Sequence, residues 1–167
     1  MKKLNFGCGN DIRKGWINVD CQKMKGVDFS FDFIKDKYPL KESEFDYVLI
    51  DNVLEHLQNP QDVMKKVWKT CKKNATVEII VPYYNSYWAH SDPTHVNYFN
   101  EDCIIQTLNI RKYEYNNKKE LYKIIELISV PQRFLKWIPM PILNVMKRFL
   151  GNIIVELKVK AKVINKK

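Results

Sequence analysis

The sequence predicts an α/β fold in which a doubly wound sheet is mostly parallel and gains an antiparallel strand pair near its C-terminal end. Three observations lead to this prediction. An apolar strand at residues 4–6 runs directly into the turn Gly7-Cys8-Gly9. In the first half of the chain, patterns typical of strands and helices alternate, as such a sheet requires. The predicted strands also end in carboxylates, and doubly wound sheets bind ligands beyond the carboxyl ends of their strands.

The composition fits one folded domain. With 167 residues, of which 46% are hydrophobic and 13% aromatic, the chain can fill a single core. No run of eighteen apolar residues is present and no long apolar stretch follows Met1, so we expect a soluble, cytoplasmic protein. The four cysteines form no Cys-x-x-Cys pair, which argues against a zinc cage and a disulfide framework and favours reduced thiols.

The positive charge is concentrated near the C-terminal end. Residues 1–120 carry 18 basic and 17 acidic side chains, whereas residues 121–167 carry 10 and 2, so +8 of the net charge of +9 lies in the last quarter. An anionic partner would therefore meet that part of the chain, although a charge of this kind also serves solubility alone.

The first three predicted strands bring two acids to the sheet edge. A turn at residues 10–14 separates the first strand from a second at 16–20, which ends in Asp20. Asp20 is placed to accept hydrogen bonds from both ribose hydroxyls of a nucleotide-type cofactor, although an exposed strand-end acid is the alternative. Residues 27–33 alternate apolar and polar side chains, which predicts a third strand with Asp32 near its end.

The region 44–82 continues the alternation of strand and helix. Residues 44–51 have the composition of a central strand covered on both faces. Asn52 and Glu55 form a capping-box pattern around the short helix 53–57. A longer helix begins at Pro60, is capped by Asn59 and ends near residues 72–74, before a fifth strand at 75–81.

The segment 83–100 is rich in aromatic and polar residues and contains no lysine or arginine, so we interpret it as an active-site wall. His90 and His95 are both candidate general bases there. A metal site would use His90, Asp92 and His95. Since Asp-Pro-Thr also forms an ordinary turn and no fourth ligand is evident, we predict no metal. A helix is expected at 101–108, capped by Asn100.

The C-terminal third predicts antiparallel strands and a basic amphipathic insertion. Strands are expected at 110–115 and 120–130, joined by a hairpin loop at 116–119, and again at 152–163 with one solvated, basic face. Residues 131–150 combine many apolar side chains with four basic ones and no acid. This profile is typical of a substrate cap, a dimer contact or a membrane-surface helix, and folding back over the domain is the alternative.

The motifs Leu4-Asn5-Phe6-Gly7-Cys8-Gly9-Asn10, Gly15 to Asp20, Phe45 to Leu57 with Val-Leu-Glu-His-Leu, and Asp92-Pro93-Thr94-His95 followed by Tyr98-Phe99 carry a family resemblance. Across residues 4–105 the chain resembles the small class I S-adenosylmethionine-dependent methyltransferases of type 11. The resemblance implies a Rossmann-like fold and one methyltransferase domain over 1–167, with a cofactor-binding core at 1–109 and C-terminal strands at 110–167. Three departures stand out: Asn5 replaces the common acid, Asp11 replaces a third glycine, and the first helix is almost absent.

The resemblance also implies the site residues. Gly7, Cys8 and Gly9 would wrap the methionine part of S-adenosylmethionine, Asp20 would hold the ribose, and Asp32 and Phe33 would flank the adenine. Asp51, Asn52 and His56 would line the methyl-donor side. The full set that we expect at the cofactor is Asn5, Phe6, Gly7, Cys8, Gly9, Asn10, Asp20, Cys21, Asp32, Phe33, Asp51, Asn52, Val53 and His56. The Gly-x-Gly-x-x-Gly spacing of nicotinamide enzymes is not met, because Ile12 occupies the third position.

Methyl transfer from a sulfonium needs mainly the positioning of acceptor and methyl group, with removal of a proton where necessary. We expect His95 to be the base or the group that orients the acceptor. The favoured acceptor is a small molecule or glycan, because no repeated basic and aromatic motif for nucleic acid is present. An RNA or protein methyltransferase and a non-catalytic module that binds S-adenosylmethionine are the alternatives. Residues 131–150 are expected to contact a second copy or a membrane surface.

Overall fold

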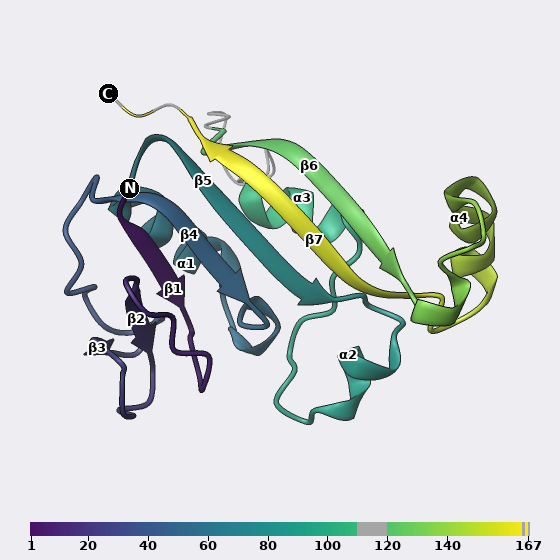
Figure 1. Ribbon diagram of the computed structural model, residues 1–167, viewed down its shortest axis with the longest axis horizontal. Helices are drawn as coiled ribbons and strands as arrows, with labels where there is room; N and C mark the ends of the chain where they lie inside the picture. The colour runs from purple at the N-terminus through teal and green to yellow at the C-terminus, as the bar shows by residue number, and fades with distance from the viewer. Residues whose placement is uncertain (110–119, 165, 167) are drawn as a thin grey trace.

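The computed structural model describes residues 1–109, 120–164 and 166, and its centre is a seven-stranded sheet (Figure 1). The strand order is β3-β2-β1-β4-β5-β7-β6. Neighbouring strands from β3 to β5 are parallel, whereas β7 runs antiparallel to both β5 and β6. The predicted fold class is therefore confirmed. The strands are β1 (Lys3–Phe6), β2 (Ile17–Asp20), β3 (Phe29–Ser30), β4 (Phe45–Asp51), β5 (Cys71–Pro82), β6 (Tyr122–Pro131) and β7 (Ile154–Val163).

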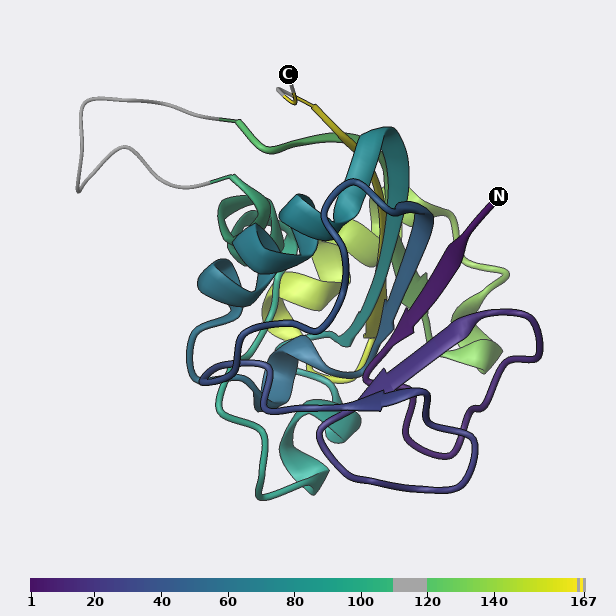
Figure 2. The ribbon, with the colours of Figure 1, turned by 90° about the vertical axis from the view of Figure 1, so that its left-hand side faces the viewer.

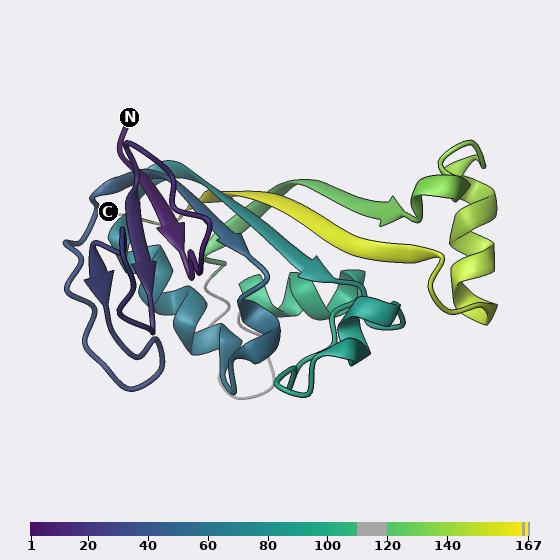
Figure 3. The ribbon, with the colours of Figure 1, turned by 60° about the horizontal axis from the view of Figure 1, so that its bottom comes forward.

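Helices α1 and α3 cover one face of this sheet (Figures 2 and 3). Alternate strand residues such as Phe6, Ile50 and Ile79 point to that face and are fully buried. The same core contains the apolar faces of both helices. The helical elements are η1 (Leu54–His56), α1 (Pro60–Thr70), α2 (Tyr87–Ser91), α3 (Glu101–Leu108), η2 (Arg133–Leu135) and α4 (Met140–Phe149).

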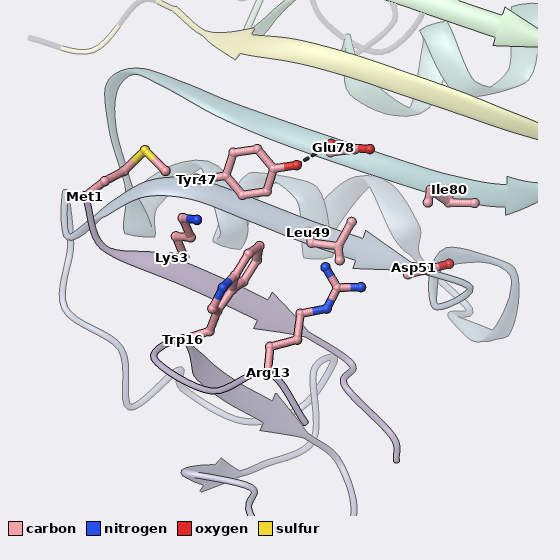
Figure 4. Close-up of a pocket in the computed structure, with 9 residues that line it drawn as sticks. All are labelled: Met1, Lys3, Arg13, Trp16, Tyr47, Leu49, Asp51, Glu78 and Ile80. Atoms are coloured by element: carbon pink, nitrogen blue, oxygen red, sulfur yellow. Dashed lines mark hydrogen bonds between the residues drawn. The ribbon is translucent and has the colours of Figure 1, made fainter. Parts of the chain in front are cut away.

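The opposite face is covered locally by the short connection between β1 and β2 (Figure 4). The ring of Trp16 lies edge-on to Tyr47, with centroids 5.5 Å apart, and the Arg13 guanidinium lies 5.3 Å from the Trp16 centroid. Together with Glu78 and Ile80, these side chains line a recess of about 410 Å³. β4 is thus covered on both faces, as its composition predicted. Helices cover one face, and side chains of the loop between β1 and β2 cover the other.

Three local predictions differ from the structure. α1 ends at Thr70 rather than near residue 73, because Cys71 pairs with Phe45 and starts a longer β5. The third strand shortens to Phe29–Ser30. The capping box is wrong, because η1 begins after Val53 with no side-chain hydrogen bond at its cap. The predicted strand 110–115 and loop 116–119 lie outside the described residues, and β6 pairs with β7 instead.

The β6–β7 pair extends beyond the remaining strands and carries η2 and α4 at its end (Figure 1). Leu143 anchors α4 and is fully buried, while the Lys147 ammonium pairs with the Glu101 carboxylate of α3. A search of the described residues finds no helix with the length and apolar character that crossing a membrane requires.

Candidate active site

The glycine turn follows β1 at the carboxyl edge of the sheet and is tied to β2. The amides of Gly7 and Cys8 both donate to the Val19 carbonyl, at 2.8 and 2.9 Å. Gly7 has φ +71°, and a Cβ atom built on it would lie only 2.3 Å from Val53 Cγ2. Gly9 has φ +48°, and a Cβ atom there would meet no atom within 4 Å. The turn is therefore packed on its Gly7 side and open on its Gly9 side.

Asp20 fixes the open side of this turn. Its side chain is nearly buried, and Oδ2 accepts a hydrogen bond of 2.8 Å from the Gly9 amide. Oδ1 accepts one of 2.9 Å from the Gln22 amide. The Cys21 thiol also lies 3.5 Å from Oδ1, as a weak donor that a ligand hydroxyl can replace. Oδ2 has no second donor among the described residues and can accept another hydrogen bond. The glycine turn and Asp20, both predicted at the cofactor, are thus joined by a hydrogen bond at the carboxyl edge of the sheet.

The end of β4 lies beside the same turn, because Ile50 is in register with Phe6. Asn52 follows with φ +51°, and its amide donates to the Ile80 carbonyl at 3.0 Å. Its side-chain amide donates to Asp51 Oδ1 at 2.9 Å. Burial raises the pKa of the Asp51 carboxyl, and the nearby charge of Glu156 raises it further.

The remaining residues predicted at the cofactor range from buried to exposed. Phe33 stacks on Phe6 with ring centroids 4.1 Å apart. The ring that was expected to flank the adenine is therefore packed in the hydrophobic core. Asp32 is half-buried, and its Oδ1 accepts hydrogen bonds from the amides of residues 34 and 35. Asn5 and Val53 are also buried, while Asn10 and Cys21 are exposed at the edge.

A second cluster lies after β4 and β5, where η1 meets the segment 92–97. It faces a pocket of about 310 Å³. The segment is held against η1 because the amides of Val96 and Asn97 donate to the Glu55 carbonyl, at 2.8 and 3.1 Å. The pocket is lined by Asn52, Glu55, His56, Pro82, Trp88, Ser91, Asp92, His95, Val155 and Glu156.

Glu55 is the most unusual member of this cluster. Its side chain is 1% exposed, and neither carboxylate oxygen has a hydrogen-bond partner. Burial raises the pKa of the Glu55 carboxyl to about 7, and the charges of Asp51 and Asp92 act in the same direction. From the sequence, Glu55 was predicted to belong to a helix cap and not to the site. Glu55 lies between the apolar residues 54 and 57 and directly before a histidine, and this pattern could have indicated a buried acid at the site.

His56 and His95 lie together beside Glu55, with ring centroids 4.7 Å apart. His95 Nδ1 lies 2.9 Å from the Ala89 carbonyl oxygen, and His56 Nδ1 lies 2.9 Å from Thr94 Oγ1. One nitrogen from each ring and one Glu55 oxygen all lie within 4.8 Å of one another. The structure thus joins His95 to residues distant in the sequence.

The metal set considered from the sequence does not assemble. His90 Nε2 lies 2.9 Å from the Tyr84 carbonyl oxygen, and its ring stacks on Tyr98 with centroids 4.8 Å apart. Asp92 accepts hydrogen bonds from the Thr94 amide and hydroxyl, which lower the pKa of its carboxyl. His90 therefore lies apart from the cluster around His95.

Comparison with known proteins points to one family. A model described as a methyltransferase domain matches residues 1–117. A search of curated protein sequences gives no significant match. Among solved structures, a SAM-dependent methyltransferase from Archaeoglobus fulgidus is similar with a TM-score of 0.64 and 19% identity, over 96% of this chain and 85% of that chain.

Two further structures have the same fold. A SAM-dependent methyltransferase from Methanosarcina mazei has a TM-score of 0.58 and 12% identity, over 99% of this chain and 93% of that chain. The cyclase SpnF has a TM-score of 0.65 and 12% identity, over 99% of this chain and 75% of that chain. At these identities the similarity concerns the fold alone, and one fold can support different reactions.

Proposed function

The chain belongs to the methyltransferase domain family, and from this premise we propose that its acceptor is a small molecule or glycan that binds beside His95. The protein is a methyltransferase whose cofactor is S-adenosylmethionine. When bound, this cofactor supplies an electrophilic methyl group on a sulfonium centre. The chain must hold it at one side of the acceptor pocket and keep the acceptor in line with that methyl group.

We propose that the glycine turn and Asp20 hold the cofactor. Two observations support this assignment. The turn is open at Gly9, where an added Cβ atom would have no neighbour within 4 Å. Oδ2 of Asp20 can accept a further hydrogen bond, and a ribose hydroxyl can replace the weak Cys21 thiol donor at Oδ1, as a pair of ribose hydroxyls requires. Asp51, Asn52 and His56 would then lie between the cofactor and the acceptor pocket.

His95 is the proposed base or orienting group for the acceptor. Its Nδ1 lies beside the Ala89 carbonyl, which can only accept a hydrogen bond. The neutral ring therefore carries its proton on Nδ1 and leaves the Nε2 lone pair free for a hydroxyl of the acceptor. Removal of such a group typically lowers turnover by about 10²- to 10⁴-fold.

The pocket lining favours a neutral, hydroxyl-rich acceptor. Trp88 is 59% exposed and offers an aromatic surface, while Asn52 and Ser91 offer polar groups. The carboxylates of Asp92 and Glu156 also line this pocket. These acids repel phosphate groups, which argues against RNA as the acceptor at this site.

We also propose that the exposed side of η2 and α4 docks on a membrane surface with anionic headgroups. Ile142, Val145 and Phe149 form an apolar stripe at helical spacing, and Phe134 and Trp137 continue it, with exposed fractions from 52% to 81%. Arg133, Lys136 and Arg148 supply cations, and residues 131–150 contain no acid. A second copy is a less suitable occupant, because a two-fold contact would bring like charges together.

Turnover with a panel of acceptors tests this proposal. We expect methyl transfer from labelled S-adenosylmethionine to hydroxylated small molecules or glycans, and a loss of at least about 100-fold in His95→Ala. His90→Ala is the matched control, because His90 lies in the same segment but outside the pocket lining. Full turnover in His95→Ala contradicts the assigned role, and exclusive, salt-sensitive transfer to RNA contradicts the acceptor class.

A further inference from the structure

We propose that Glu55, His56 and His95 bind a divalent metal ion of the zinc type at the acceptor side of the pocket. Metal binding is argued from these three side chains alone, while the role given to the ion rests on the proposed function. From the sequence we predicted no metal, because Asp-Pro-Thr forms an ordinary turn and no fourth ligand was evident beside His90, Asp92 and His95. The set that the fold assembles is different.

The donor atoms converge closely enough for one ion. One nitrogen of each histidine and one carboxylate oxygen lie within 4.8 Å of one another. Ligand atoms around a tetrahedral zinc ion lie about 3.3 Å apart, given bonds of about 2.0–2.1 Å. Contraction of the largest separation by about 1.5 Å therefore completes three coordination positions, which small side-chain rotations can supply.

Hydrogen bonds fix His56 in the state that a metal ligand requires. The Thr94 hydroxyl donates to Asp92 Oδ1 at 2.6 Å, so its oxygen must accept from His56 Nδ1 at 2.9 Å. His56 therefore carries its proton on Nδ1 and presents a bare Nε2. His95 is held in the same tautomer by the Ala89 carbonyl. A histidine that binds a metal usually donates its other ring N–H to a nearby oxygen, which fixes the tautomer and the orientation of the ring.

Glu55 supplies the third donor and the strongest reason to expect a cation. Its carboxylate is 1% exposed and has no hydrogen-bond partner at either oxygen. A buried charge without a partner is strongly unfavourable in a folded protein. Both neighbouring rings offer lone pairs instead of protons, so neither can satisfy the ionised carboxylate. A bound cation satisfies the carboxylate and both nitrogens at once.

The donor set and the pocket indicate which ion and what role. Two imidazoles and one carboxylate suit zinc and similar transition metals, whereas magnesium prefers oxygen ligands. Three protein ligands leave a position open, and the adjoining pocket of about 310 Å³ gives an acceptor room to reach it. His95 would then orient the acceptor through the ion.

An ion in this position would promote methylation of a hydroxyl group. The positive charge lowers the pKa of an acceptor hydroxyl that it binds. The hydroxyl proton leaves to solvent, and the oxygen forms a bond to the methyl carbon as the carbon–sulfur bond of the sulfonium breaks. The products are the methylated acceptor, S-adenosylhomocysteine and one proton, so atoms and charges balance.

Metal titration of the tag-free, full-length protein tests the proposal. After treatment with a chelator, calorimetry with Zn²⁺ should show one site, and Co²⁺ should give the visible absorption of a low-symmetry site with nitrogen ligands. Loss of an outer support costs about 10- to 100-fold in affinity, so loss of a ligand in Glu55→Gln or His95→Ala should cost at least about 100-fold. His90→Ala should bind as the wild type does.

A second variant tests the hydrogen-bond support. Thr94→Ala should weaken Zn²⁺ binding by about 10- to 100-fold, and Thr94→Ser, which keeps the hydroxyl, should restore it. Circular dichroism establishes that each variant is folded, and Glu55→Gln keeps the shape of the side chain if a histidine variant does not fold. No Zn²⁺ binding, or equal binding in wild type and Glu55→Gln, overturns the proposal.

The same samples separate this proposal from the proposed function. If the stripped protein binds S-adenosylmethionine but not Zn²⁺, the metal site is wrong and the methyltransferase assignment stands. If Zn²⁺ binds with the expected loss in Glu55→Gln but no acceptor is methylated, the metal site stands and the acceptor proposal fails.

Discussion

Three glycines with positive φ offer a matched test of the turn that follows β1. Gly7, Gly9 and Gly15 have φ of +71°, +48° and +80°, so alanine at any of them adopts an unfavourable backbone conformation. This conformation costs about 1–2 kcal/mol for a residue with a side chain. Only at Gly7 does the new Cβ atom also collide with a neighbour, at 2.3 Å from Val53 Cγ2.

The magnitudes follow from these contacts. Gly15→Ala should lose about 1–2 kcal/mol of unfolding free energy, from the backbone alone. Gly7→Ala should lose about 1–3 kcal/mol more, which is the usual effect of overpacking a buried site. Gly9→Ala should resemble Gly15→Ala in stability, because no atom lies within 4 Å of its new carbon. Its affinity for S-adenosylmethionine should fall by at least about tenfold, since the carbon enters the space assigned to the cofactor.

Urea unfolding and calorimetry with S-adenosylmethionine measure the two effects separately. Gly15→Ala should keep wild-type affinity, and it serves as the control for the backbone effect. Equal stabilities of Gly7→Ala and Gly15→Ala would refute the packing at Val53. Unchanged affinity in Gly9→Ala would refute the placement of the cofactor at the open side of the turn.

Two further predictions concern the C-terminal region. Burial alone raises the pKa of Glu101, but hydrogen bonds from Lys147 and a serine outweigh it, so the folded pKa lies below its ordinary 4.5. The resulting stabilisation is present above about pH 4.5 and is lost as the pH falls through the folded pKa. The urea midpoint of Lys147→Gln should therefore fall less on acidification than the urea midpoint of the wild-type protein. Replacement of both Trp137 and Phe149 by alanine should weaken binding to phosphatidylserine vesicles by about 100-fold or more, because each buried ring contributes about 1.5–3 kcal/mol. Ile125→Ala, on β6, is the control, and equal vesicle binding in all proteins would reject the docking surface.

Local sequence was sufficient to predict the glycine turn and the alternation of strands and helices along the first half of the chain. A strand followed by Gly-x-Gly and a second strand ending in Asp20 lie within the first twenty residues, so the pattern predicted that both reach the carboxyl edge of the sheet. The hydrogen bond between Asp20 and Gly9 is a finding of the structure. The end of α1 was harder to predict, because Cys71 leaves the helix to pair with Phe45 on a neighbouring strand. Such pairing overrides local helix propensity.

The cluster beside the pocket shows the limit of local patterns. Glu55 three residues after Asn52 is the signature of a capping box, yet its carboxylate makes no hydrogen bond. His90 and His95 are neighbours in the sequence, but the fold places His95 with His56 instead. Hydrogen bonds between η1 and the segment 92–97 determine this arrangement, and no spacing in the sequence predicts them.

The central claim is that Asp20 and the glycine turn hold S-adenosylmethionine, and calorimetry tests it most directly. The wild-type protein should bind both S-adenosylmethionine and S-adenosylhomocysteine. Asp20→Ala should weaken both by about 100-fold, because hydrogen bonds to a charged group contribute about 1.5–3 kcal/mol each. Asp102→Ala, an exposed acid on α3, should bind as the wild type does. Wild-type affinity in Asp20→Ala, or no binding by the wild-type protein, would contradict the account.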